Sequence, residues 1–140
     1  MGVHLALDPG ERRTGIALCD PEEILASPHS THDRQRDRSL LDLVAGICSE
    51  HGVETVIVGH AIGQGGERGE SARRGERIAA LLTERLESAG VQVELFDERY
   101  STAEAQRILA GRKHERGDRD ALAAALILQA WLDARREVSG

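Results

Sequence analysis

Three carboxylate residues stand where predicted strands end or a predicted helix begins. Asp8 closes the apolar run Val3–Leu7 and precedes a Pro-Gly dipeptide, which turns the chain because proline fixes φ and glycine accepts positive φ. Glu98 closes a later apolar strand, and Asp120 opens the last predicted helix. Three converging carboxylates repel one another unless a cation neutralises them. Hard oxygen ligands select Mg²⁺ or Mn²⁺, and a pair of such ions suits attack of water on a phosphodiester.

Each of these carboxylates also has a structural role open to it. Asp8 can cap the turn, Glu98 can form a surface ion pair, and Asp120 can cap the last helix and complement its dipole. In a parallel α/β sheet, ligands bind at the carboxyl ends of the strands. If the first and last strands lie near one another, the joint placement of the three residues favours a metal site.

The hydrophobic pattern predicts which elements must position these residues. A first hairpin is followed by a short third strand over Ile24–Ser27, which Pro28 ends, and by a polar loop over residues 29–38. The later elements alternate between helix and strand: 40–48, 54–59, 71–89, 91–98, a helix from Ser101, and 120–136. An antiparallel hairpin extended by right-handed crossovers gives an α/β fold with a mixed sheet flanked by helices.

Composition narrows the class of protein further. A chain of 140 residues with 40% hydrophobic residues suits one folded domain, and 2% aromatic residues argue against a surface that stacks on bases. Neither a membrane-length apolar run nor a signal peptide is present, so we expect a cytoplasmic protein without a membrane partner. Cys19 and Cys48 have no metal-like spacing, and we expect both to be reduced core thiols.

Basic residues concentrate in two segments although the net charge is −6. The first segment is a candidate for holding a nucleic-acid backbone and contains Arg112, Lys113, Arg116 and Arg119. The second contains Arg68, Arg73, Arg74 and Arg77, and for both segments a solvated surface is the alternative. Arg99 either contacts the scissile phosphate or pairs with a carboxylate such as Asp97.

Several of these motifs resemble the YqgF/RuvX family. They are Asp8-Pro9-Gly10 with Arg13, Gly15 and Ala17; Ile57-Val58-Gly59; Asp97-Glu98-Arg99 with Ser101-Thr102; and Asp120 followed by Ala123-Ala124 and Ile127-Leu128-Gln129. Actin-like ATPases share the opening Asp-x-Gly, but the last two motifs together are more specific. The resemblance implies a ribonuclease H-like fold, with Asp8, Glu98 and Asp120 as catalytic residues that bind Mg²⁺ or Mn²⁺. It also implies cytoplasmic action on the 5′ end of precursor 16S rRNA within a ribosomal particle.

Two segments depart from the family pattern. The family has Gly-Leu-Pro after the fourth strand, where this chain has Gly59-His60-Ala61 and a glycine-rich stretch, and Glu11 replaces a small hydroxyl residue. Neither change removes a proposed ligand. Two other functions stay open: cleavage of branched DNA by the same chemistry, which would need a symmetric dimer rather than a monomer, and non-catalytic RNA binding in ribosome assembly or transcription.

Overall fold

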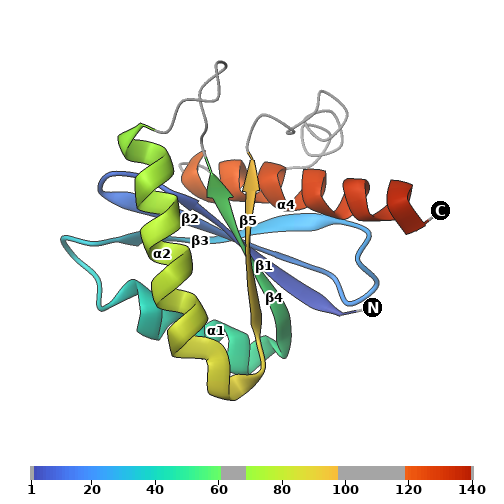
Figure 1. Cartoon of the computed structure of the whole chain (residues 1–140), viewed down its shortest axis with the longest axis horizontal. Helices are drawn as coiled ribbons and strands as arrows, with labels where there is room; N and C mark the ends of the chain where they lie inside the picture. The colour runs from blue at the N-terminus through green and yellow to red at the C-terminus, as the bar shows by residue number, and fades with distance from the viewer. Residues whose placement is uncertain (1, 61–68, 98–118, 140) are drawn as a thin grey trace.

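The computed structural model describes residues 2–60, 69–97 and 119–139. Five strands form one mixed sheet in the order β3-β2-β1-β4-β5, as Figure 1 shows. The strands are β1 (Val3–Pro9), β2 (Arg13–Cys19), β3 (Ala26–Asp33), β4 (Val53–His60) and β5 (Gln92–Asp97). The helices are α1 (Leu40–His51), α2 (Glu70–Leu86), the short 3₁₀ helix η1 (Glu87–Ala89) and α4 (Arg119–Ser139). The predicted mixed five-stranded sheet is therefore confirmed.

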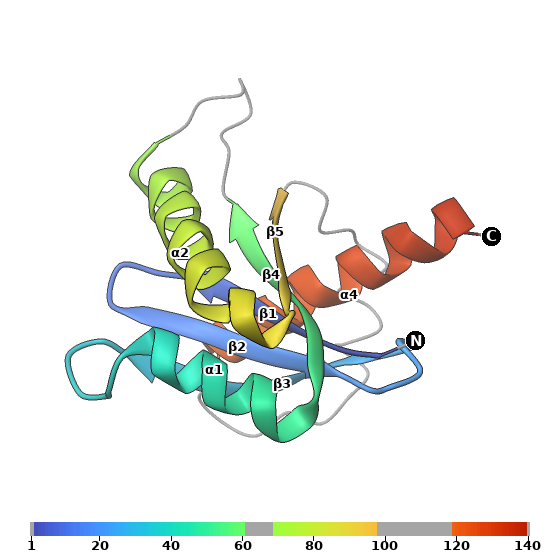
Figure 2. The same cartoon turned by 60° about the horizontal axis from the view of Figure 1, so that its bottom comes forward.

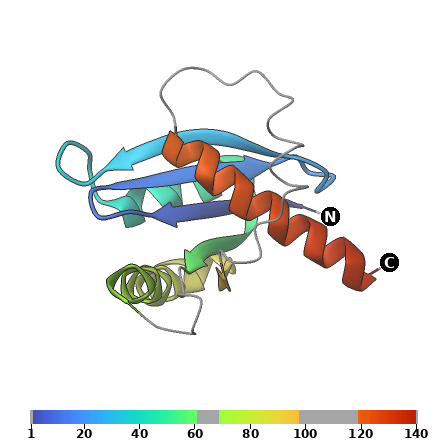
Figure 3. The same ribbon diagram turned by 90° about the horizontal axis from the view of Figure 1, so that it is seen from above.

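Helices cover both faces of this sheet. β1 pairs antiparallel with β2 and parallel with β4, so β1 is the central strand. Helices α1 and α2 pack on one face and α4 runs across the other, and the views in Figures 2 and 3 separate the two layers. Because side chains alternate along a strand, Leu5 and Leu7 face α1 and α2, whereas Ala6 faces α4.

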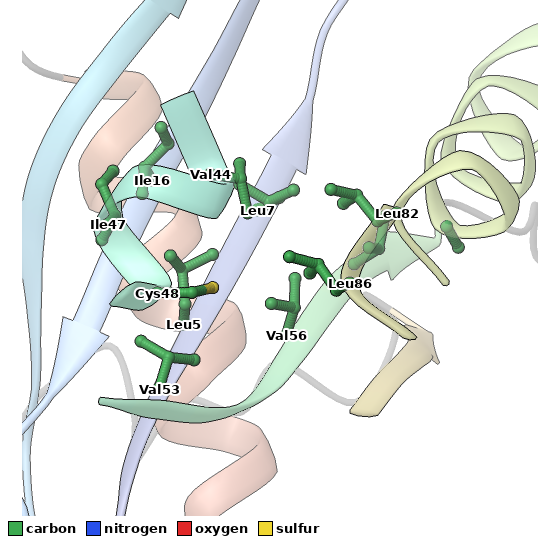
Figure 4. Close-up of a cluster of buried hydrophobic side chains, with 12 residues drawn as sticks. Leu5, Leu7, Ile16, Val44, Ile47, Cys48, Val53, Val56, Leu82 and Leu86 are labelled. Atoms are coloured by element: carbon green, nitrogen blue, oxygen red, sulfur yellow. The ribbon is translucent and has the colours of Figure 1, made fainter. Parts of the chain in front are cut away.

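The larger apolar cluster lies between β1, β4, α1 and α2. Figure 4 shows Leu7 of β1 between Val44 of α1 and Leu82 of α2, and Leu5 beside Cys48. Cys48 belongs to this cluster, and Cys19 belongs to the cluster under α4. Burial raises the pKa of both thiols to about 11, so both stay protonated and unreactive at neutral pH. Both cysteines are buried and form no disulfide, which confirms the expected core role.

The helix ends of the α1–α2 layer follow the sequence signals. The side chain of Ser39 accepts a hydrogen bond from the Asp42 amide at the start of α1. Gly52 ends α1 at φ +65°, and Gly90 ends η1 at φ +72°, both in the left-handed region where a side chain would be strained. Glycine is the residue that the sequence offers as a stop after each of the predicted helices over 40–48 and 71–89, and both stops are confirmed.

The third strand is longer than the sequence suggests. β3 runs through Pro28 and five residues beyond it, so the prediction of a short strand and a polar loop was wrong here. β3 lies at the edge of the sheet and pairs with β2 only, and the register shifts beside Pro28, where β3 has one extra residue, His29. An edge position tolerates a residue without an N–H group. His32, predicted to be a solvated loop residue, is buried and donates a hydrogen bond to the carbonyl of Arg38.

The apolar faces of α2 and α4 differ in part from the prediction. The hydrophobic pattern predicts a buried face of Ile78, Leu81, Leu82 and Leu86 on α2, and of Leu122, Ala125, Leu126 and Leu132 on α4. On α2, Leu82 and Leu86 are buried, but Leu81 is 50% exposed. On α4, small residues provide much of the contact with the sheet: Ala121, Ala124, Ala125, Leu128 and Leu132 are almost fully buried. Small side chains let α4 approach the strands closely. Within the described ranges, no helix is both long and apolar enough to cross a membrane.

Candidate active site

Asp8 lies near the carboxyl end of the central strand. It is the second-last residue of β1, and strand alternation puts its side chain on the same face as Ala6, under α4. The side chain is half-buried. The carboxyl ends of β4 and β5 reach the same edge because these strands run parallel to β1, with β4 between β1 and β5. Asp8 therefore lies at the end of the sheet where the parallel strands β1, β4 and β5 have their carboxyl ends.

Asp120 reaches this edge from the opposite end of the sequence. Asp8 pairs with Gly15 of β2, so their Cα atoms lie roughly 5 Å apart across the antiparallel ladder. A β-carbon at position 15 would overlap the carbonyl group of Asp120 and lie 2.8 Å from the amide nitrogen of Ala121. The first turn of α4 therefore rests directly on the backbone of Gly15. This contact brings Asp120, which is also half-buried, beside the end of β1.

Glu98, the third predicted ligand, lies outside the described residues. β5 ends at Asp97, one residue before it. β4 separates β1 from β5, so the ends of the first and last strands are two strand spacings, about 10 Å, apart. Within the described ranges, no three histidine, cysteine or acidic side chains gather in a way that could hold a metal ion. The described part of the chain thus brings together two of the three predicted carboxylates.

The candidate nucleic-acid contacts are described only at Arg119. This residue is exposed and directly precedes Asp120 in the first turn of α4. The other four lie outside the described residues: Arg99, Arg112, Lys113 and Arg116.

Sequence reasoning missed the arrangement at the end of β4. His60, predicted to begin a loop, is the last residue of β4, and its Nε2 lies 2.7 Å from Oε2 of Glu76 on α2. Gly75 allows this approach, because a β-carbon there would come within 2.8 Å of the Gly59 carbonyl oxygen. A glycine inside a helical pattern was the available signal. His60 pairs with α2, so it lies on the face opposite the two carboxylates.

The donor chemistry at this edge fits a hard divalent cation. Asp8 and Asp120 both supply carboxylate oxygens, the ligands that Mg²⁺ and Mn²⁺ prefer. Both side chains are half-buried, so they combine a fixed position with access for a phosphate group. Carboxylates that converge in one site favour a bound cation, which neutralises their charge.

Comparison with solved structures defines the fold class. The chain matches Thermus thermophilus RuvC in complex with a Holliday junction substrate, with a TM-score of 0.68 and 16% identity, over 98% of this chain and 97% of that one. It also matches the yeast mitochondrial Holliday junction resolvase Ydc2, with a TM-score of 0.61 and 10% identity, over 97% and 80% of the two chains. The fold is therefore that of the RuvC-like, ribonuclease H-like nucleases.

Sequence comparison identifies the family. The model of the RuvX family, described as Holliday junction resolvase, matches residues 2–134. A relative from Chloroflexus aurantiacus is 37% identical over 138 residues, 96% of this chain and 88% of the relative. One from Mycobacterium ulcerans is 40% identical over 143 residues, 99% of this chain and 83% of the relative. Each bears the name "Putative pre-16S rRNA nuclease". The chain belongs to the RuvX family, as its motifs predicted.

Proposed function

We propose that this protein is a metal-dependent endonuclease that processes the 5′ end of precursor 16S rRNA in the cytoplasm. The observation that carries the proposal is the packing of the first turn of α4 on Gly15, beside Asp8. Asp8 and Asp120, which come from opposite ends of the sequence, are both half-buried at the same end of the sheet. Family membership and the names of the relatives support RNA as the substrate.

Asp8 and Asp120 would hold Mg²⁺ or Mn²⁺ together with Glu98. We include Glu98 because it directly follows β5, a strand whose Glu94 and Phe96 contact the α4 side of the sheet. A bound divalent ion supplies activated water and neutralises charge on the phosphate. The protein supplies position: the central strand holds Asp8 between two neighbouring strands, so its carboxylate needs little reorganisation when substrate binds.

Basic residues near the carboxylates would hold the RNA backbone. Arg119 is placed for this role by its exposure beside Asp120. We assign the same role, from their sequence position, to Arg99, Arg112, Lys113 and Arg116. Such contacts position the substrate without reading its sequence. The proposal holds for a monomer or a homodimer.

Cleavage of branched DNA is a second candidate function. The fold match to RuvC and the description of the family favour it. Symmetric cutting of a four-way junction requires two active sites related by a two-fold axis, and therefore a dimer. Processing of one RNA strand has no such requirement. We rank RNA first because the names of the relatives specify it.

A side-by-side cleavage assay separates these functions. Precursor 16S rRNA and a four-way DNA junction are incubated with the protein in Mg²⁺, Mn²⁺ or EDTA. We expect RNA to be cut near its 5′ end with either metal and not in EDTA. Cutting of the junction alone would replace the proposal with the resolvase function. RNA binding without cleavage under any condition would contradict both, and would assign a non-catalytic role.

A further inference from the structure

A basic cavity opens on the α1–α2 face of the sheet. Its volume is about 420 Å³, within the usual range of ligand sites. Three segments that are distant in sequence line it: the turn between β1 and β2, the connection from β3 to α1, and the middle of α2. Five arginines line this cavity, against two acidic residues: Arg12, Arg34, Arg38, Arg74 and Arg77, against Glu11 and Asp37. We call it the arginine pocket.

The positive charge of the arginine pocket is largely available to a ligand. Arg34, Arg38 and Arg74 form no ion pair with any carboxylate in the described part of the chain. Arg12 is committed to Asp33, whose carboxylate lies 3.1 Å from its Nε. Arg77 pairs with Glu70 at 3.3 Å, but both side chains are more than half exposed, so water weakens this pair. On the acidic side, the Asp37 carboxylate already accepts a hydrogen bond from the Asp33 amide. A chain with net charge −6 thus concentrates unpaired guanidinium groups in one hollow.

Apolar side chains complete the lining. They are Leu40, Ile78 and Leu81, and Leu81 is 50% exposed although α2 buries its other large apolar residues more fully. Guanidinium groups recognise phosphate oxygens, often through two hydrogen bonds each. An apolar surface beside them suits a ribose or the face of a base. The combination matches the alternating chemistry of a nucleic-acid strand.

The arginine pocket begins at the turn that follows the candidate active site. Gly10, two residues beyond Asp8, lines it. Asp8 itself faces the α4 side, so a strand that crosses the sheet edge at this turn can contact both. We propose that the arginine pocket binds the phosphodiester backbone of the RNA substrate on one side of the cleaved bond. The proposal rests on the proposed nuclease function for the identity of the strand.

Binding measured without cleavage tests the arginine pocket separately from catalysis. Arg38→Gln combined with Arg74→Gln removes two unpaired charges from the arginine pocket. Affinity for a fluorescent 5′ fragment of precursor 16S rRNA is measured by anisotropy in EDTA over a range of salt concentrations. We expect binding to weaken roughly tenfold and the slope of log K against log salt to fall by about 1.4, since each phosphate contact contributes about 0.7 on a single strand.

A matched control removes the same charge from neighbouring positions. Arg36→Gln combined with Arg73→Gln also replaces two exposed arginines, and neither lines the arginine pocket. This control should change affinity and slope by less than half as much. Equal effects in the two double variants would overturn the proposal, because only net charge would then matter. Unchanged binding in the Arg38 and Arg74 double variant would overturn it as well.

A second pair of variants tests the apolar lining by charge repulsion. Leu81→Glu puts a carboxylate into the arginine pocket from an exposed position, so folding should be unaffected. Ala80→Glu puts the same charge on the adjacent exposed residue outside it. We expect only Leu81→Glu to weaken RNA binding, roughly tenfold. Equal binding by both variants would contradict the proposal, whether or not either variant still cleaves RNA.

Discussion

Replacing Asp8 with asparagine should lower the rate of RNA cleavage by about 10³-fold or more. The substitution keeps the shape of the side chain and its place at the end of β1 but removes a negative charge from the proposed metal site. A thermal melt shows whether the variant is folded under the conditions of the cleavage assay. The measurement is single-turnover cleavage of precursor 16S rRNA in saturating Mg²⁺, with a thermal melt of the same sample.

Asp42→Asn provides the matched control. Asp42 lies in the first turn of α1 on the other side of the sheet, where its carboxylate pairs with Arg85 at 3.1 Å. Both side chains of that pair are exposed, so its loss should change stability by less than about 1 kcal/mol. Cleavage by this variant should equal that of the wild type. Activity retained by Asp8→Asn would show that the carboxylate has a structural role only, such as capping the turn.

Replacing Gly15 with alanine should lower cleavage by about 10²-fold without removing any charged group. The added β-carbon overlaps the carbonyl of Asp120, so the first turn of α4 must move away from β2. A displacement of about 1 Å at a reacting group has an effect of this size. Overpacking at this contact should also destabilise the protein by about 1–3 kcal/mol. Activity is therefore compared at a temperature where urea unfolding shows that both proteins are folded.

Gly46→Ala is the control for the glycine substitution. Gly46 lies in α1, and a β-carbon there would meet no atom within 4 Å. Alanine should stabilise the helix by about 0.5–1 kcal/mol and leave cleavage unchanged. If Gly15→Ala cleaved RNA at the wild-type rate while folded, the position of Asp120 over β2 would not matter for catalysis.

The sequence predicts the position of Asp8 well because local signals determine it. An apolar run that ends in a carboxylate and a Pro-Gly turn has few alternative structures, and β1 ends at Pro9, one residue beyond the predicted end at Asp8. The ends of α1 and of η1 follow equally from single glycines in the left-handed region. The placement of the first carboxylate at an edge of the sheet was thus predictable from about ten residues.

The approach of Asp120 to Asp8 was not predictable in the same way. It depends on the packing of a helix on a strand more than 100 residues earlier, and on the absence of a side chain at Gly15. The small residues on the buried face of α4 are a weak signal, because the predicted stripe gave more weight to leucines such as Leu122 than to Ala121 and Ala124. The sequence therefore indicates that residue 120 is a carboxylate at a helix start, whereas its position beside β1 depends on tertiary packing.

The arginine pocket could not be predicted from the sequence, because its residues come from segments that are distant along the chain. Arg74 and Arg77 stood out as part of a basic cluster, but Arg12, Arg34 and Arg38 come from two other segments. The edge strand β3 was predicted to end before Pro28, but it continues to Asp33. The connection from β3 to α1 is therefore shorter than the predicted loop over residues 29–38. Only the assembled sheet brings these segments together around one hollow.

A titration with Mn²⁺ tests the central claim, that Asp8 and Asp120 form one metal site. Calorimetry measures the affinity of the wild type, Asp8→Asn, Asp120→Asn and the double variant, with Asp42→Asn as control. We predict that each single substitution weakens binding at the strongest site roughly tenfold or more, and that the double variant loses little beyond the more affected single variant. Wild-type affinity in Asp120→Asn, or fully additive losses in the double variant, would contradict a shared site.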